Sequence, residues 1–230
     1  MPAGLIAALD TADPVQARRW AASLLPPCGM VKLGLEFYLA NGPAGVRGLG
    51  DVPVFLDLKL HDIPNTVAGG VRAVLPLAPR MLTLHAAGGA AMIAAAREAA
   101  DAAGAGRPKL LAVTVLTSLD SEALAATGVA GGPRQQALRL ARLALDSGAD
   151  GLVCSAQEAP MLRDAFGRSA LLVVPGIRPT GSGAGDQRRT TTPREAAATG
   201  ADWLVVGRPI TQATDPACAA AAIVAELNAA

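Results

Sequence analysis

The stretch LLVV at residues 171–174 is apolar at every position, and LVV at residues 204–206 repeats the pattern. A β-strand points successive side chains to opposite faces, so a run without polar residues is typical of a strand covered on both faces. Such strands belong to parallel sheets, because the crossover connections of these sheets lay helices over both faces. We therefore expect a parallel sheet that is enclosed by helices.

Eight short runs rich in Leu and β-branched residues recur along the chain, and segments of helical character lie between them, for example Pro133 to Asp146. The expected strands are Gly4 to Asp10, Met30 to Phe37, Val52 to Leu60, Met81 to Ala87, Lys109 to Leu116, Gly151 to Ser155, Leu171 to Arg178 and Trp203 to Gly207. Eight βα units fit a chain of 230 residues. We predict an α/β fold, in which residues 1–230 form a single (β/α)8 TIM barrel.

A doubly wound open sheet is the alternative fold. It usually carries a GxGxxG turn after its first strand, whereas residues 8–11 read ALDT. The Gly-rich run at residues 181–185 has a different spacing and follows the seventh expected strand, where a flexible lid is the better interpretation.

The composition excludes several classes of partner. The chain is 51% hydrophobic and 3% aromatic with a net charge of +1, so it lacks the basic surface and stacking platform that bind nucleic acid. Its longest stretch without a charged residue, Met81 to Ala96, is too short to span a membrane, and the N-terminus does not resemble a signal peptide. We expect a cytoplasmic protein whose three cysteines, Cys28, Cys154 and Cys218, are buried reduced thiols.

Charged residues interrupt three consecutive expected strands near their carboxyl ends, where parallel barrels place their active sites. By the alternation of a strand, Asp57 and Lys59 share the face that points into the barrel mouth, and Asp62 follows the strand. Lys32 interrupts the second strand and can approach Asp57, and Asp10, which ends the first strand, adds another carboxylate. A structural ion-pair network is the alternative for any one residue, but four at neighbouring strand ends favour an active site.

Two Gly-Arg turns follow the seventh and eighth expected strands, GIR at residues 176–178 and GRP at residues 207–209. Barrels of this type commonly bind phosphate at these two positions, where glycine lets the backbone approach and arginine supplies a bidentate charge. The pair of turns predicts a phosphorylated ligand.

The segment DLKLHDIPNT at residues 57–66 resembles the signature of the orotidine 5'-phosphate decarboxylase family. Six further motifs are similar to that family's and occur in the same order along the whole chain: LD at 9–10, VKLG at 31–34, LTS at 116–118, PGIRP at 175–179, DQ at 186–187 and VGRPI at 206–210. DxKxxD alone is shared with relatives that act on sugar phosphates, and the longer segment is more specific.

The resemblance implies a carboxy-lyase that converts orotidine 5'-phosphate to UMP in de novo pyrimidine biosynthesis, with no metal and no cofactor. It implies that Lys59 donates a proton to C6 of the pyrimidine, with Lys32 and Asp57 beside it as catalytic residues. The fourth catalytic residue, Asp62, would come from the partner subunit of a homodimer with shared active sites.

The resemblance also implies substrate-binding roles. Asp10 would bind the ribose hydroxyls, Thr66 would act across the subunit interface, and Thr117 would lie at the pyrimidine. The phosphate would be bound by Gln187 and Arg208 with the backbone of Gly207. The remaining substrate-binding positions are Lys32 and Arg178.

Two other functions stay open on the sequence. A metal-dependent decarboxylase or aldolase of sugar phosphates would keep the third-strand motif, but an ammonium group at Lys32 would repel a metal ion. A non-catalytic phosphate-binding barrel would keep the Gly-Arg turns, and the complete set of charges argues against it. His61 and His85 are interpreted as hydrogen-bonded structural histidines, because no third ligand accompanies them.

Overall fold

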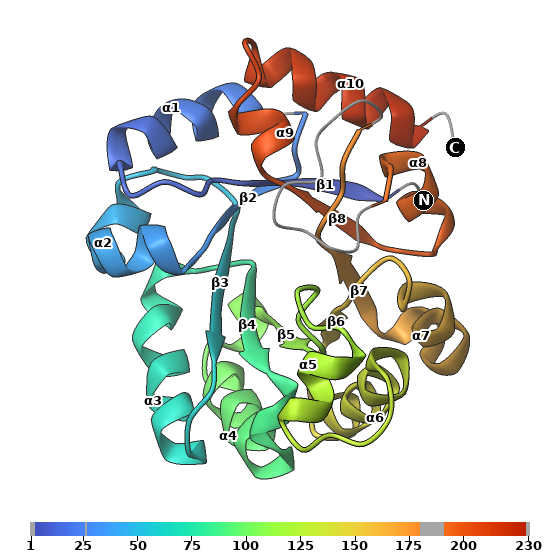
Figure 1. Ribbon diagram of the computed structural model, residues 1–230. Coiled ribbons are helices and arrows are strands. Elements are labelled where there is room, and N and C mark those ends of the chain that lie inside the picture. The colour runs from blue at the N-terminus through green and yellow to red at the C-terminus, as the bar shows by residue number, and fades with distance from the viewer. Residues whose placement is uncertain (1–2, 26, 180–190, 229–230) are drawn as a thin grey trace.

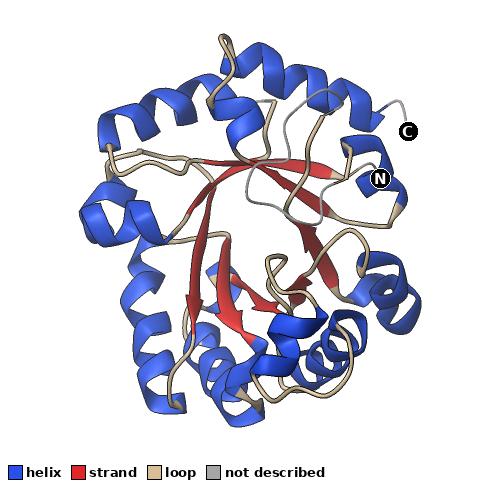
Figure 2. Ribbon diagram, in the orientation of Figure 1, coloured by secondary structure: helices blue, strands red, loops and turns tan. Residues whose placement is uncertain are grey.

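A computed structural model describes residues 3–25, 27–179 and 191–228. Within these ranges eight parallel strands form a closed barrel in chain order, with β8 paired to β1. The strands ring the centre and the helices lie outside them (Figure 1, Figure 2). The predicted (β/α)8 TIM barrel is confirmed. The strands are β1 (Gly4–Ala8), β2 (Met30–Leu33), β3 (Val54–Leu60), β4 (Met81–His85), β5 (Lys109–Val113), β6 (Gly151–Val153), β7 (Leu171–Val174) and β8 (Trp203–Val206).

Every expected strand contains an observed one, but seven of the eight end earlier than predicted. Two runs end four residues early, Leu171 to Arg178 and Met30 to Phe37; in the second, β2 stops at Leu33 and a helix begins at Leu35. Gly34 caps that helix with extended backbone, so the chain leaves the sheet there. Apolar side chains continue past the strand ends because the loops and first helical turns also pack against the barrel.

The helices cover the outside of the barrel, and α6 (Pro133–Asp146) has the bounds expected from the sequence. Asp13 caps α1, and Pro14 occupies its first turn. The helices are α1 (Pro14–Leu24), α2 (Leu35–Arg47, kinked at Gly42), α3 (Pro64–Val74), α4 (Ala90–Asp101), α5 (Ser121–Ala126), α6 (Pro133–Asp146), α7 (Ala159–Phe166), α8 (Pro193–Ala198), α9 (Arg208–Thr211) and α10 (Pro216–Asn228). Among the described residues, no helix has the length and apolar character needed to cross a membrane.

Two apolar clusters stabilise the barrel, one on each side of the strands. Leu172 and Leu204 belong to the cluster between strands and helices, whereas Val173 and Val205 belong to the smaller cluster inside the barrel. This division explains why the LLVV and LVV runs lack polar residues, since both of their faces are buried. The inner cluster also forms an apolar floor beneath the carboxyl ends of the strands.

The cysteines differ in burial. Cys28 and Cys154 are buried as expected, but Cys218 is exposed, so the prediction of three buried thiols is wrong for that residue. Cys218 lies in the first turn of α10, where its position faces away from the buried residues of that helix.

The indole of Trp203 packs against two glycines at the amino-terminal end of the barrel. A Cβ atom at Gly29 would lie 2.8 Å from Cζ3 and 2.9 Å from Cη2 of Trp203. A Cβ at Gly4 would meet the same ring. Both positions therefore need glycine for close packing.

We expect Gly29→Ala to lower the free energy of unfolding by about 1 to 3 kcal/mol, because the added methyl group overlaps a ring that is already packed on both glycines. Urea unfolding followed by circular dichroism measures the change. Gly69→Ala is the matched control. Its Cβ would find only the Arg72 guanidinium, at 3.8 Å, within 4 Å, and alanine in a helix should stabilise α3 by roughly 0.5 to 1 kcal/mol. Equal stability of Gly29→Ala and the wild type would contradict this packing.

Candidate active site

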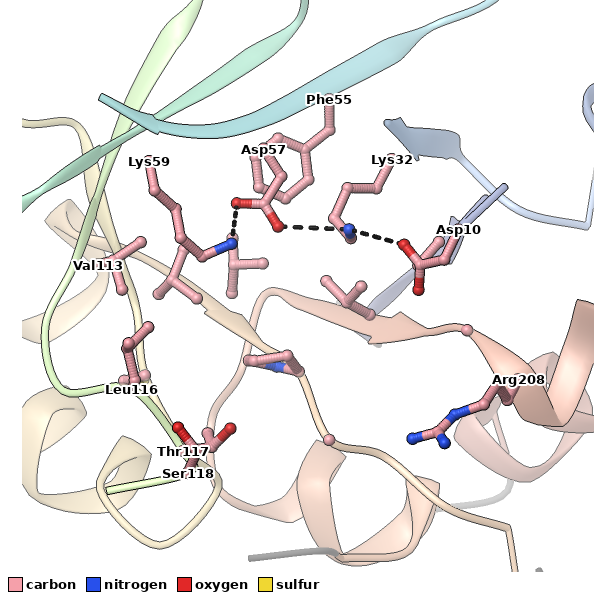
Figure 3. A pocket seen from close by; sticks show the side chains of 18 of the residues that line it. Asp10, Lys32, Phe55, Asp57, Lys59, Val113, Leu116, Thr117, Ser118 and Arg208 are labelled. Carbon is pink, nitrogen blue, oxygen red and sulfur yellow. Dashed lines mark hydrogen bonds and ion pairs between the residues drawn. The ribbon is translucent and has the colours of Figure 1, made fainter. Parts of the chain in front are cut away.

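A cavity of about 560 Å³ opens at the carboxyl ends of the strands, a size typical of sites for small ligands. Side chains from β1, β2, β3, β5, β6, β7 and β8 or the residues after them line it (Figure 3). The polar and glycine lining residues are Asp10, Lys32, Asp57, Lys59, Thr117, Ser118, Gly176, Arg178, Gly207, Arg208 and Gln212. Residues from widely separated parts of the chain therefore meet in one cavity.

Alternating charges form a chain along one wall of the cavity. Lys59 Nζ lies 2.8 Å from Asp57 Oδ1, and Lys32 Nζ lies 3.3 Å from Asp57 Oδ2. Lys32 Nζ also lies 3.5 Å from Asp10 Oδ1, so the order is Lys59, Asp57, Lys32, Asp10 (Figure 3). The side chains of Lys32 and Asp57 are only 11% and 14% exposed. Mutual pairing offsets the loss of hydration that burial of such charges entails.

The carboxyl group of Asp57 responds to opposing influences. Burial by itself would raise its pKa, but the charges of Lys32 and Lys59, with hydrogen bonds from Lys59 and Thr83, outweigh burial and hold the pKa below its ordinary value. Asp57 is therefore an anion throughout the neutral range.

Lys59 departs from the regular strand that the sequence predicts. Its φ angle is 48°, in the left-handed region, and the pairing of β3 with β4 shifts register between Leu56 and Leu60. Asp57 and Lys59 do point into the same cavity, as predicted, and Leu58 packs against the helices. The sequence analysis missed the residue that accompanies this shift, Thr83 of β4. Its signal was a polar residue within the apolar run at residues 81–84.

Two arginines line the cavity, and Figure 3 shows Arg208 across it from Lys59. Arg178 follows β7 and Arg208 begins α9 after β8, and both line the cavity. Burial lowers the pKa of Arg178, and the positive charge of Arg208 lowers it further. Two guanidinium groups that repel each other in a cavity are well suited to share an anionic ligand, because a bound phosphate would relieve the repulsion.

The remaining predicted substrate-binding positions divide into two groups. Thr117 and Gly207 line the cavity, and a Cβ atom at Gly207 would lie 3.4 Å from Asp10 Oδ2, so the backbone approaches the charges closely. Gln187 and the lid expected at residues 181–185 lie outside the described residues. Gln212, which the sequence analysis did not select, also lines the cavity.

Asp62 and Thr66 do not line the cavity of their own chain. Both are exposed, at the loop before α3 and in its first turn, and Asp62 Oδ1 accepts a hydrogen bond from the Ile63 amide at 2.6 Å. Their expected role lies in a partner subunit's site, which a single chain does not test. That role stays a prediction.

The two histidines stack beside the site. Their ring centroids are 5.2 Å apart with an interplanar angle of 19°, and His61 is exposed above the half-buried His85. His85 Nδ1 is buried and has no hydrogen-bond partner among the described residues, so the expectation of fully hydrogen-bonded histidines is wrong for this atom. Burial lowers the pKa of His85, and His61 and Lys59 lower it further.

Comparisons with known proteins agree with one another. The family model "Orotidine 5'-phosphate decarboxylase / HUMPS family" matches residues 4–223. A protein named orotidine 5'-phosphate decarboxylase from Gluconobacter oxydans is 56% identical over 97% of this chain and 96% of its own length. One of the same name from Rhodospirillum rubrum is 56% identical over 96% and 92%. The crystal structure of orotidine 5'-phosphate decarboxylase from Lactobacillus acidophilus has a TM-score of 0.87 and 39% identity, and the alignment covers 98% of this chain and 99% of that one.

We expect Asp57→Asn to lower the free energy of unfolding at pH 7 by about 3 kcal/mol, because it leaves the buried Lys32 charge without its main partner. The double variant Asp57→Asn, Lys32→Met should recover much of that loss, because it removes the unpaired charge. Chemical unfolding of the wild type and the three variants gives the coupling energy. A double variant as unstable as the sum of both single variants would contradict the electrostatic account.

The same series should depend on pH. The pKa of Asp57 is lower in the folded chain than in the unfolded one, so its contribution to stability is complete above the unfolded value and is lost as the pH falls through the folded value. The stability gap between wild type and Asp57→Asn should therefore shrink in acid. A gap that widens in acid would reverse the sign of the argument.

Proposed function

The chain belongs to the orotidine 5'-phosphate decarboxylase / HUMPS family, and we infer that it is a carboxy-lyase that decarboxylates orotidine 5'-phosphate to UMP in pyrimidine biosynthesis. The observation that carries this function is the chain of charges from Lys59 to Asp10, with Lys32 and Asp57 buried at its centre, along one wall of a cavity that two arginines also line. A nucleotide matches both features, because its base would react beside Lys59 and its phosphate would be bound by the arginines.

We further propose that Lys59 acts as both electrostatic stabiliser and proton donor. Cleavage of the bond between C6 and the carboxylate releases CO2 and leaves the electron pair on C6, where no adjacent carbonyl group can delocalise it. A fixed ammonium group beside C6 stabilises that charge in the transition state. The same group then transfers a proton to C6, and the neutral amine regains a proton from solvent. The reaction therefore needs no electron sink from a cofactor.

Asp57 has the role of holding the lysines in this proposal. Its two carboxylate oxygens are engaged by different lysines, Oδ1 by Lys59 and Oδ2 by Lys32, which supports positioning over simple repulsion of the substrate carboxylate. Lys32 also contacts Asp10, the residue proposed to bind the ribose hydroxyls. The position of the ribose is thereby linked to the position of Lys59 through the contacts of Asp10 with Lys32, Lys32 with Asp57 and Asp57 with Lys59.

The phosphate is remote from the bond that breaks, so its binding energy must act through position. Arg178 and Arg208, with Gln187 and the backbone of Gly207, are proposed to bind it, and Thr117 to lie near the base. Binding at a distant group accelerates the reaction when it fixes C6 against Lys59 and excludes water.

A metal-dependent enzyme acting on sugar phosphates is the alternative within this fold. Lys32 Nζ lies 3.3 Å from Asp57 Oδ2, so an ammonium group occupies the position beside the carboxylate that a cation would need. A barrel that only binds phosphate would have no use for an alternating chain of four charges along one wall of the cavity. Both observations support the decarboxylase.

We also propose a cytoplasmic homodimer with shared sites. Asp62, Ile63 and Thr66 are exposed, and Ile63 retains 67% of its surface in the single chain. An exposed isoleucine between an aspartate and a helix start suits an interface in which Asp62 and Thr66 reach the partner's cavity.

We expect Lys59→Ala to lower kcat/KM for orotidine 5'-phosphate by at least about 1,000-fold, since it removes both the stabilising charge and the proton donor. The fall in ultraviolet absorbance as the substrate is consumed measures the rate. Lys109→Ala is the control, because Lys109 is an exposed lysine of the same barrel at the start of β5, and its activity should equal the wild type's.

Turnover by the wild type should be unaffected by EDTA. Activity that EDTA abolishes and magnesium restores would support the metal-dependent alternative.

In the lysine experiment, full activity of the Lys59→Ala variant would contradict the proposed role of Lys59.

Mixed dimers test the sharing of sites. Lys59→Ala and Asp62→Ala subunits should each be inactive alone, whereas a mixed dimer has one site in which both residues are intact. Co-expression with two different affinity tags isolates the mixed species, which should regain part of the wild-type activity. Inactive mixed dimers of confirmed composition would contradict shared sites.

A further inference from the structure

Thr83 lies on β4 next to the proposed catalytic residues but does not line the cavity. Its side chain is fully buried, and its hydroxyl group is used in both directions. The Oγ1 atom accepts a hydrogen bond from the Lys59 amide at 2.8 Å and donates one to Asp57 Oδ1 at 3.0 Å. One hydroxyl group therefore contacts the backbone of one site residue and the carboxylate of another.

The first contact supports a backbone conformation that is unfavourable for lysine. The left-handed φ of Lys59 is unfavourable in a residue with a side chain, and it persists only where the surroundings enforce it. In the pairing of the two strands, Leu56 lies opposite Leu82 and Leu60 lies opposite Leu84. The chain therefore advances four residues along β3 while it advances two along β4. Thr83 lies opposite the additional residues of β3, and its hydroxyl oxygen accepts the hydrogen bond from the Lys59 amide.

The second contact fixes the carboxylate. Asp57 Oδ1 receives both the Thr83 hydroxyl and the Lys59 ammonium, while Oδ2 faces Lys32. A partial rotation of the carboxylate about its Cβ–Cγ bond would move Oδ1 away from both of its donors. Thr83 thus helps to fix the plane of the carboxylate between the two lysines.

We propose that Thr83 is a positioning residue for the decarboxylation, in which one buried hydroxyl group sets the backbone of Lys59 and the carboxylate of Asp57 together and so aims the ammonium group at C6. This inference rests on the proposed function. Thr83 acts through Lys59 and Asp57, because its side chain does not line the cavity where substrate would bind.

Thr83→Val tests the role, because valine has nearly the shape of threonine and lacks the hydroxyl group. We expect kcat to fall roughly 100-fold, since a displacement of about 1 Å at a reacting group costs that much, while KM stays within about twofold because the phosphate contacts are intact. Thr83→Ser keeps the hydroxyl group and should restore most of the rate. Thr83→Ala makes the same comparison if the valine variant folds poorly.

Thr114→Val is the matched control. Thr114 is also a buried threonine near a strand end, and its hydroxyl group donates to the Val153 carbonyl at 3.1 Å, without contact to Lys59 or Asp57. If removal of any buried hydroxyl group impaired the enzyme, Thr83→Val and Thr114→Val would lose the same stability and the same kcat. We expect comparable losses of stability but a wild-type kcat for Thr114→Val. Equal kcat values in the two variants would overturn the proposal.

Crystal structures of the variants test the geometry without turnover. In Thr83→Val we expect φ of Lys59 to leave the left-handed region or the contact between Lys59 Nζ and Asp57 to lengthen, with both preserved in Thr83→Ser. An unchanged Lys59 and Asp57 in Thr83→Val would overturn the inference even if the wild type decarboxylated the substrate. A wild type without turnover, in contrast, would reject the proposed function while the structures still decide the positioning role.

Discussion

The site depends on the carboxylate of Asp57 being held between two ammonium groups in a place with little water. Each lysine needs the carboxylate to offset its lost hydration, and the carboxylate needs the lysines for the same reason. The result is a rigid arrangement, because movement of Asp57 would leave Lys59 without its ion-pair partner and Lys32 with only the more exposed Asp10. Under the proposed function, that rigidity keeps the Lys59 ammonium aimed at one atom of the substrate.

The barrel makes this arrangement possible. Its parallel strands end at one edge, so three consecutive strands or the residues after them deliver Asp10, Lys32 and Asp57 to the same wall. The apolar cluster inside the barrel, which includes Phe55 and Val205, closes the cavity from below. Arginines after the last two strands complete its lining. The fold supplies stability through its two apolar layers, which leaves the strand ends free to carry charges.

Local pattern was enough to predict the eight strands, the closed barrel and the meeting of Asp57 with both lysines, because strand alternation and the strand spacing of a parallel sheet are regular. It was not enough where distant segments decide the outcome. The left-handed Lys59 and its contact with Thr83 arise from a register shift between β3 and β4, which no window of the sequence reveals. The strand ends and the exposed Cys218 depend on packing in three dimensions. The proposed roles of Asp62 and Thr66 need a second chain.

The most direct test of the account is a crystal structure of the protein with UMP bound. The account predicts that Lys59 Nζ lies within hydrogen-bond reach of C6, at about 3 Å, still paired with Asp57, while the phosphate contacts Arg208. A nucleotide bound with C6 far from Lys59, or with the ammonium group turned away from the base, would contradict the central claim that this lysine meets the electron pair left by CO2.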